Sequence, residues 1–280
     1  MEDSPSCYRH TDRPTRISCS RCEKPICTNC MIAAPVGYRC PDCMKATAPP
    51  VTRTVAGGAV ITTPRVTYSL IGINVLFFAI QYLEGINQVA VEYGMYPVAI
   101  AQGGESWRLF TSAFLHGSFI HIAFNMYILF FLGSTLERIL GHTRFTVLYL
   151  LAALGGSVAS YWFSDLNTVS VGASGAIFGL MGALIVAGRR LRYDISQVLL
   201  LLAINVAIGF FSPLVDWRAH FGGLIVGAVV ATIMVFPPKR IRIPVQIAGV
   251  LSLVFILIAL TMLRTNQIND LLEPVTQLIT

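Results

Sequence analysis

The chain has 280 residues, of which 55% are hydrophobic and only 12% are charged, and its formal net charge is +6. Soluble globular proteins usually carry about a quarter charged residues, so this composition excludes the ordinary soluble class and indicates an integral membrane protein. The net positive charge is informative only through its distribution along the chain, because positive residues collect in the cytoplasmic loops of membrane proteins and so indicate orientation.

Residues 1–45 form a small module that contains all seven cysteines of the chain. An odd number of cysteines cannot pair completely within one chain, which argues against a disulfide framework. Four ligand pairs stand at the two-residue spacing that is typical of metal knuckles: Cys7 and His10, Cys19 and Cys22, Cys27 and Cys30, Cys40 and Cys43. Eight ligands make two closed tetrahedral sites, which are structural, so we predict two structural Zn²⁺ ions. An iron–sulfur centre is the alternative.

The module has few apolar residues, so we expect it to fold only with metal. It resembles a B-box-type zinc domain. That resemblance implies a cross-brace, in which the first ligand pair joins the third and the second joins the fourth. From the spacing alone, sequential pairing stays open.

The role that we expect for this module is recognition of a cytoplasmic protein partner or recruitment of a substrate. Residues 1–65 carry nine Lys or Arg against five Asp or Glu. This small excess leaves nucleic acid as an alternative and would suit anionic lipid headgroups as well. We expect no nucleic-acid partner.

Residues 46–66 are rich in Ala, Thr, Pro and Gly, which is typical of a linker. From Tyr68 onward, apolar runs alternate with short polar breaks, and a helix needs about 20 residues to cross the hydrocarbon layer. The runs predict seven membrane-spanning helices, over residues 68–83, 117–137, 145–163, 173–188, 195–212, 217–236 and 244–263. The first and the fourth are somewhat short, and either could begin below the membrane surface.

Positive residues alternate between the two sides of this predicted bundle. The loops after the second, fourth and sixth spans carry eight Lys or Arg residues, whereas the loops after the odd-numbered spans and the tail carry three. Because positive residues collect on the cytoplasmic side, we expect the N-terminus and the zinc module in the cytoplasm and the C-terminus outside. The expected location is the plasma membrane.

Polar side chains converge on one leaflet. The second, fourth and sixth spans begin at the outer surface and carry five polar residues there: His116, His121, Asn125, Ser174 and His220. Polar residues inside membrane spans are costly, and each is a functional hypothesis by default. Taken singly, each could be an ordinary hydrogen-bonding contact between helices. Their shared depth favours a functional site.

The residue types suit peptide hydrolysis. A serine hydroxyl is a weak nucleophile that needs an adjacent base, which imidazole supplies near neutral pH. Attack on an amide creates an oxyanion that requires fixed donors, and Ser174 begins a helix whose first N–H groups are unpaired. The nearby carboxylates Asp165 and Asp216 are not well placed to orient the imidazole. The sequence therefore predicts a dyad of Ser174 and His220.

Small residues predict that the two helices of this dyad pack closely. Gly175, Gly179 and Ala183 recur at every fourth position of the fourth span, and Gly223 and Gly227 do so in the sixth. Small residues at this spacing let helix backbones approach each other. The fourth span is therefore expected to pack on the sixth and to bring Ser174 near His220.

In these motifs the chain resembles the rhomboid intramembrane serine proteases. The resemblance covers about residues 68–240, in matching order: Trp107-Arg108, the segment from His116 to Asn125, Glu137-Arg138, Gly172-Ala173-Ser174-Gly175, and His220 with Gly223 and Gly227. It implies an all-α polytopic membrane protein with a six-helix core over residues 67–240. Residues 241–280 would add a seventh transmembrane helix and an external tail, beside the small cytoplasmic zinc-binding domain.

The same resemblance implies roles for single residues. Ser174 and His220 would be the catalytic dyad, with no cofactor. Further residues would form or support the oxyanion hole or meet the substrate: His116, His121, Asn125 and Gly172. Many relatives have a tyrosine four residues after the serine, where this chain has Phe178, which still offers a ring for the imidazole to stack on. The implied substrates are single-span transmembrane proteins, cut within the lipid bilayer or near its surface.

The loop from Glu84 to Leu115 is long and rather apolar, and by resemblance part of it lies in the membrane. An ordinary extracellular loop is the alternative. Two other functions compete with the protease. One is a rhomboid-like binder that escorts membrane clients without cutting them. The other is a zinc-regulated transporter that uses His116, His121 and His220, which no acidic residue accompanies.

Overall fold

The computed structural model describes residues 4–47, 53–212 and 215–277, with only the backbone path given for Phe210 and residues 274–277. The chain divides into two compact units, Met1–Thr52 and Arg53–Thr280. The first holds the cysteine-rich module, and the second holds every long helix of the described residues.

The first unit is built around its cysteines. Two short antiparallel strands, β1 (Ile32–Ala33) and β2 (Tyr38–Arg39), are followed by α1 (Pro41–Thr47). The fully buried side chains of its described part are Ile26 and five of the cysteines. So small a core provides too little apolar burial to stabilise a domain of this size by itself.

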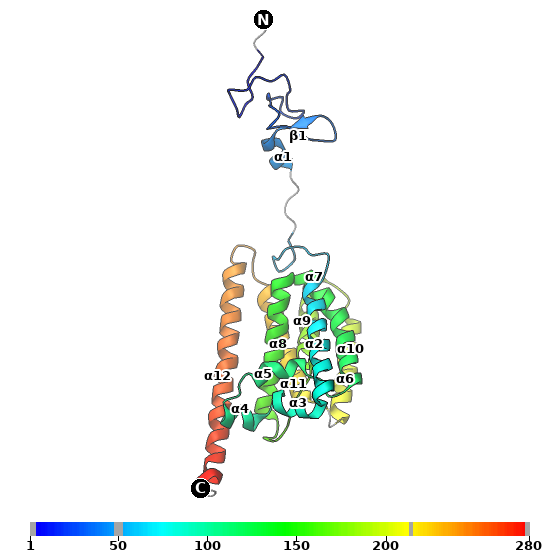
Figure 1. Cartoon of the computed structure of the whole chain (residues 1–280), viewed down its shortest axis with the longest axis vertical. Coiled ribbons are helices and arrows are strands. Elements are labelled where there is room, and N and C mark those ends of the chain that lie inside the picture. Colours follow the sequence, from blue (N-terminus) through cyan, green and yellow to red (C-terminus); the bar gives the residue numbers. More distant parts are fainter. Residues whose placement is uncertain (1–3, 48–52, 213–214, 278–280) are drawn as a thin grey trace. The chain divides into compact units, whose positions relative to one another are not determined.

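The second unit is all-helical in its described residues, which confirms the expected all-α polytopic fold class. Its elements in chain order are α2 (Arg65–Glu84), α3 (Ile86–Tyr93), α4 (Pro97–Gly103), α5 (Arg108–Thr111), η1 (Ser112–Phe114), α6 (Phe119–Ile128), η2 (Leu129–Gly133), α7 (Ser134–Leu140), α8 (His142–Phe163), α9 (Ser174–Leu191), α10 (Ser196–Phe211), α11 (Trp217–Val235) and α12 (Arg242–Gln277). Figure 1 shows the long helices running side by side, with α12 along one edge of the bundle.

Helices occupy all seven predicted spans. Six segments are long and apolar enough to cross a membrane: α2, the continuous run α6–η2–α7, α8, α9, α11 and α12. The fifth predicted span corresponds to α10, whose 16 residues are fewer than the roughly 20 that a crossing needs. By contrast, α12 extends for 36 residues, well beyond the predicted 244–263.

The predicted linker contributes its last part to the helical unit. From Arg53 the chain forms a tight turn in which the Thr54 hydroxyl accepts a hydrogen bond from the Gly58 amide (2.9 Å). The carbonyl of Ala56 accepts one from the side chain of Gln246 on α12 (3.0 Å). Residues 53–59 are therefore fastened to the bundle by hydrogen bonds.

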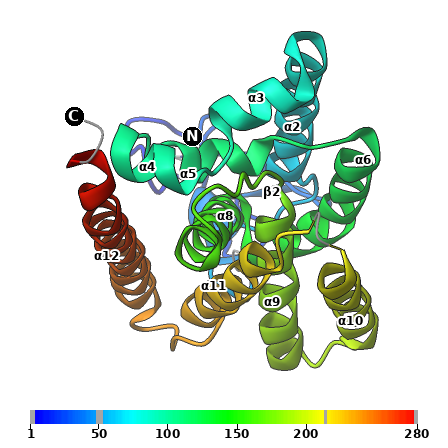
Figure 2. The ribbon, with the colours of Figure 1, turned by 90° about the horizontal axis from the view of Figure 1, so that it is seen from below.

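The centre of the unit consists of α8, α9 and α11, which lie side by side in Figure 2. Glycines make this close packing geometrically feasible. A Cβ placed on Gly179 would lie 2.9 Å from the carbonyl oxygen of Gly223, and one placed on Gly223 would overlap the carbonyl of Gly175. This confirms the expected packing of the two small-residue faces against each other.

Gly223→Ala is expected to lower the thermal unfolding temperature of the purified protein, because its methyl group has no space beside the Gly175 carbonyl. Overpacking of this kind typically costs about 1–3 kcal/mol. Gly72→Ala on α2 is the matched control, since no heavy atom lies within 4 Å of its added Cβ. Equal unfolding temperatures of the two variants in detergent would contradict the proposed tight contact.

Candidate active site

Ser174 is the first residue of α9, and the chain that leads into it is held on two sides. Ser170 pairs with Met95 through two backbone hydrogen bonds (2.9 and 3.0 Å), and the Gly172 amide donates to the Ser112 carbonyl (2.9 Å). Gly172 has φ 138°, a conformation that side chains rarely adopt. A Cβ there would also lie 2.9 Å from Nε2 of His121. Only glycine fits this position.

His220 lies in the first turn of α11 and meets Ser174 directly. Its Nε2 is 2.8 Å from the Ser174 hydroxyl oxygen, which is hydrogen-bond distance. Phe178, one turn along α9 from Ser174, stacks on the imidazole with ring centroids 4.0 Å apart and planes inclined by 14°. His220 is buried. The pair is therefore fixed both by its hydrogen bond and by the aromatic ring beneath it.

His121 approaches the same place from α6. Its Nδ1 accepts a hydrogen bond from the Gly117 amide (3.3 Å). In a neutral imidazole one nitrogen accepts and the other carries the proton, so this contact places the proton on Nε2. Nε2 faces the position of Gly172 beside Ser174. His121 can therefore donate a hydrogen bond into the space next to the Ser174 hydroxyl.

The other two residues proposed for the oxyanion network do not contact Ser174. The amide nitrogen of Asn125 donates to the backbone carbonyl of His121 in its own helix (2.8 Å). His116 is fully buried and packs edge-on against the His121 ring (centroids 5.1 Å apart). Its backbone N–H and C=O both bond to the buried side chain of Gln81. Asn125 and His116 thus contact His121 and not Ser174.

Asp216 links two segments of the site, and the sequence did not predict this role. It does not contact the imidazole, as expected, but one carboxylate oxygen caps α11 by accepting from the Arg218 and Ala219 amides (3.1 and 3.2 Å). The other oxygen accepts from the hydroxyls of Ser170 (2.6 Å) and Ser160. The sequence could have indicated the capping role, because aspartate is a favoured N-cap residue. Asp216 therefore joins the loop before Ser174 to the helix that carries His220.

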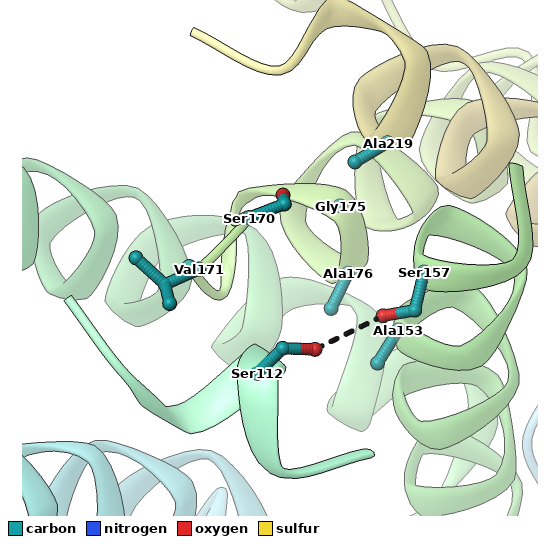
Figure 3. A pocket seen from close by; sticks show the side chains of 9 residues that line it. Ser112, Ala153, Ser157, Ser170, Val171, Gly175, Ala176 and Ala219 are labelled. Carbon is teal, nitrogen blue, oxygen red and sulfur yellow. Dashed lines mark hydrogen bonds between the residues drawn. The ribbon is translucent and has the colours of Figure 1, made fainter. Parts of the chain in front are cut away.

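A small cavity of about 20 Å³ lies against the loop that precedes Ser174 (Figure 3). Its polar wall is formed by Ser112 and Ser157, whose hydroxyl oxygens are 3.3 Å apart. Gly172 and Gly175, on either side of Ser174 in the sequence, also line it. A cavity of this size with polar partners holds about one water molecule.

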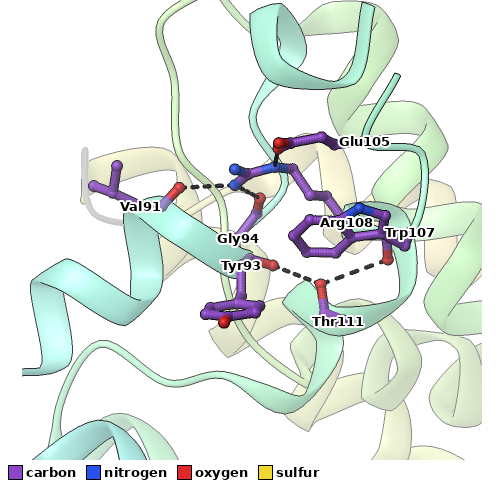
Figure 4. A network of polar contacts seen from close by, with 7 residues as sticks. All are labelled: Val91, Tyr93, Gly94, Glu105, Trp107, Arg108 and Thr111. Carbon is purple, nitrogen blue, oxygen red and sulfur yellow. Dashed lines mark hydrogen bonds and ion pairs between the residues drawn. The ribbon is translucent and has the colours of Figure 1, made fainter. Parts of the chain in front are cut away.

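The long first loop is folded into the short helices α3, α4 and α5 rather than left irregular. Arg108 organises it: the side chain is 7% exposed, and Nη1 donates to the carbonyls of Val91 (2.7 Å) and Gly94 (3.1 Å). Its Nε binds the carboxylate of Glu105, as Figure 4 shows. The neighbouring Trp107 is half-exposed. The Trp107-Arg108 motif therefore serves the structure of this loop, and its depth in a membrane stays a prediction.

The cysteine-rich unit gathers its eight ligands into two groups: Cys7, His10, Cys27 and Cys30, and Cys19, Cys22, Cys40 and Cys43. This is the cross-brace pairing. Within each group the ligand atoms lie within 4.8 Å of one another. Zn–S bonds of about 2.3 Å put two sulfurs of a tetrahedral site about 3.8 Å apart, and Cys22 and Cys40 are separated by 3.7 Å. The residues present fit zinc.

Comparison with known proteins places the helical unit in one family. The family model described as "Rhomboid domain" matches residues 103–237, which include Ser174, His220 and His121. Rhomboid protease GluP of Bacillus subtilis is 36% identical over 182 residues, covering 62% of this chain and 36% of GluP. The mitochondrial RHOMBOID-like protein 6 of Arabidopsis thaliana is 37% identical over 147 residues, covering 50% of this chain and 47% of that protein.

The chain thus spans between about a third and a half of the length of these two relatives. A shorter relative is covered more fully. Putative rhomboid protease YdcA of Bacillus subtilis is 34% identical over 150 residues, covering 52% of this chain and 75% of YdcA. On this similarity, and on a matched domain that runs from the first loop through α11, the chain belongs to the rhomboid family.

Proposed function

We propose that the chain is an intramembrane serine endopeptidase that cleaves single-span transmembrane proteins near the outer membrane surface. Ser174 is the nucleophile and His220 the general base. The observation that carries this proposal is the 2.8 Å distance between the Ser174 oxygen and Nε2 of His220. Relatives named as rhomboid proteases support it.

In this mechanism, Nε2 of His220 takes the hydroxyl proton as the Ser174 oxygen attacks the scissile carbonyl. The resulting oxyanion accepts hydrogen bonds from the first amides of α9 and from Nε2–H of His121. His220 then gives its proton to the departing amine, and an acyl-enzyme remains on Ser174. Water, deprotonated by His220, releases the new carboxylate and restores the hydroxyl.

Within the described residues, no carboxylate forms a hydrogen bond to the imidazole of His220. Asp216 contacts other groups, and the face of the imidazole is held by Phe178 instead. Stacking fixes the plane of the ring, which is the orienting task that the third member of a serine triad performs. A dyad is therefore sufficient to aim Nε2 at Ser174.

The proposal is tested by adding a single-span substrate to the protein in liposomes and following cleavage. The wild type should cut, and Ser174→Ala should not. Cleavage retained by Ser174→Ala would exclude this nucleophile. If neither protein cuts, the non-cutting binder is favoured. The transporter is disfavoured because, in the described part of the chain, the groups suited to a metal both lie in the cysteine-rich module.

We further propose that the first unit binds two structural Zn²⁺ ions and recognises a cytoplasmic protein partner. The orientation proposed from loop charges puts this unit and the N-terminus in the cytoplasm, and the C-terminus outside the plasma membrane. Protease digestion of intact cells tests the orientation, since a tag after Thr280 should be removed and a tag before Met1 should be protected. Removal of the N-terminal tag alone would contradict this orientation and indicate the reverse topology.

We expect Asp216 to act as a positioning residue for this reaction. Asp216→Ala releases both the loop of Ser170 and the start of α11, and a misplacement of about 1 Å can cost about 100-fold in rate. The expected result is a loss of kcat of about 10- to 100-fold with little change in KM.

Asp216→Asn should recover most of this loss, because an amide can still cap the helix and bond both serine hydroxyls. Asp165→Ala is the matched control: this carboxylate lies exposed in the same loop. The positioning role fails if Asp216→Ala raises KM alone, or if Asp165→Ala slows turnover equally.

A further inference from the structure

Three arginines converge on the turn at residues 53–59, far from Ser174 in the fold. Arg144 comes from the start of α8, Arg242 from the start of α12, and Arg53 from the turn itself. A point one Cβ bond from Gly57 lies 3.1 Å from Nη1 of Arg242 and 3.9 Å from Nη2 of Arg144. Two guanidinium groups therefore face the same small space.

These side chains are held in place by neutral groups. Nε of Arg144 donates to the Gln246 side chain (3.0 Å), which is buried and also binds the carbonyls of Ala56 and Met234. Nε of Arg242 donates to the Pro237 carbonyl (3.4 Å). Because the Nε atoms are occupied, the outer nitrogens of both arginines are left directed at Gly57. The arrangement is built before any ligand arrives.

No negative charge balances this cluster within the described residues. The ion pairs found there involve other residues, and no carboxylate pairs with any of the three arginines. Arg144 instead experiences the like charges of Arg242 and Arg53. Like charges at such distances repel, and the repulsion grows where the surroundings are poorly solvated. An anion bound between them would relieve this repulsion.

Gly57 lets the arginines approach the turn closely. Its φ of 87° is one that glycine adopts readily and other residues rarely do. A side chain there would contact the Arg242 guanidinium at 3.1 Å. The turn thus sets the guanidinium groups of Arg242 and Arg144 beside Gly57, an arrangement called the arginine notch below. Guanidinium donors match phosphate oxygens in geometry and charge.

We propose that this notch binds the phosphate of an anionic phospholipid headgroup. It lies where α8 and α12 begin, at the end of the bundle whose loops carry most of the positive charge. Headgroups of an anionic inner leaflet would meet it there. The bound phosphate would bridge the turn, α8 and α12, and would fasten the seventh helix to the core.

Native mass spectrometry of the purified full chain, with added phosphatidylglycerol, tests this site. The wild type should retain one more tightly bound lipid than Arg144→Gln, which should bind at that site about tenfold more weakly. Arg242→Gln should behave alike, which guards against a folding defect in one variant. Arg189→Gln removes the same charge from an exposed position at the end of α9 and should bind as the wild type does.

Equal retention of phosphatidylglycerol by the wild type and both notch variants would overturn the proposal. Equal losses in Arg189→Gln would overturn it too, since general surface charge would then explain the binding. A parallel series uses inorganic phosphate and follows thermal unfolding. If phosphate alone stabilises the wild type but not Arg144→Gln, and lipid adds nothing, the ligand is a soluble phosphate and not a membrane lipid.

Discussion

Purified wild-type protein should react with a serine-directed fluorophosphonate, and Ser174→Ala and His220→Ala should show no labelling. The reagent requires a hydroxyl whose proton can pass to a base, and the 2.8 Å contact of these two side chains provides that. Loss of either member of such a pair should lower the rate of peptide cleavage by about 10⁴-fold or more. The two losses should not add, because the residues act as one unit.

The matched control is Ser252→Ala, which removes an exposed hydroxyl from α12 and should label fully. Labelling of Ser174→Ala at the wild-type rate would mean that another residue carries the reactive hydroxyl. A His220→Ala variant that labels normally would remove the base from the mechanism. Unchanged thermal unfolding of both variants must accompany the result, so that lost labelling reports chemistry and not misfolding.

Chelation of metal should unfold the first unit and leave the second intact. Structural Zn²⁺ in small domains contributes about 10–16 kcal/mol of apparent binding free energy, whereas the module's own core is Ile26 and five cysteines. The wild type should contain two zinc ions per chain. After treatment with a strong chelator, residues 4–47 should become sensitive to protease, while fluorophosphonate labelling of Ser174 continues.

Cys27→Ser tests one of the two sites. It removes a ligand from the group with Cys7, His10 and Cys30, so the bound zinc should fall from two ions to one. Thr28→Ala alters an exposed neighbour and should keep both. Iron with visible absorbance in the purified protein would refute zinc in favour of an iron–sulfur centre. Labelling lost on chelation would show that catalysis depends on the metal after all.

The contact between Ser174 and His220 was predictable because its signals are local. Ser174 begins an apolar run after a glycine-containing turn, and His220 lies one turn into another run. The glycines that follow each residue predict the contact between their helices, and α9 and α11 do pack through them. Where periodicity and small residues occur on both partners, the sequence is enough to propose that two distant residues meet.

Other features depended on contacts that no local pattern encodes. The serine hydroxyls on Asp216 come from α8 and from the loop before α9, so its joining role appears only when three segments meet. The amide of Asn125 donates to the carbonyl of His121 in its own helix, a bond that the sequence did not predict, and its role in the oxyanion hole stays a prediction. A side chain with several donors has several partners within reach, and packing selects among them.

The sequence by itself determined the membrane class, the positions of seven helices, the residue types of the two candidate metal sites and the contact between Ser174 and His220. Each follows from the composition or from a spacing pattern along the chain, and these can be recognised without knowledge of the fold. The tertiary structure alone decided the tautomer-setting contact of His121, the carboxylate bridge of Asp216 and the arginine notch at Gly57. These depend on side chains from separate helices, whose distances are set only when the bundle packs.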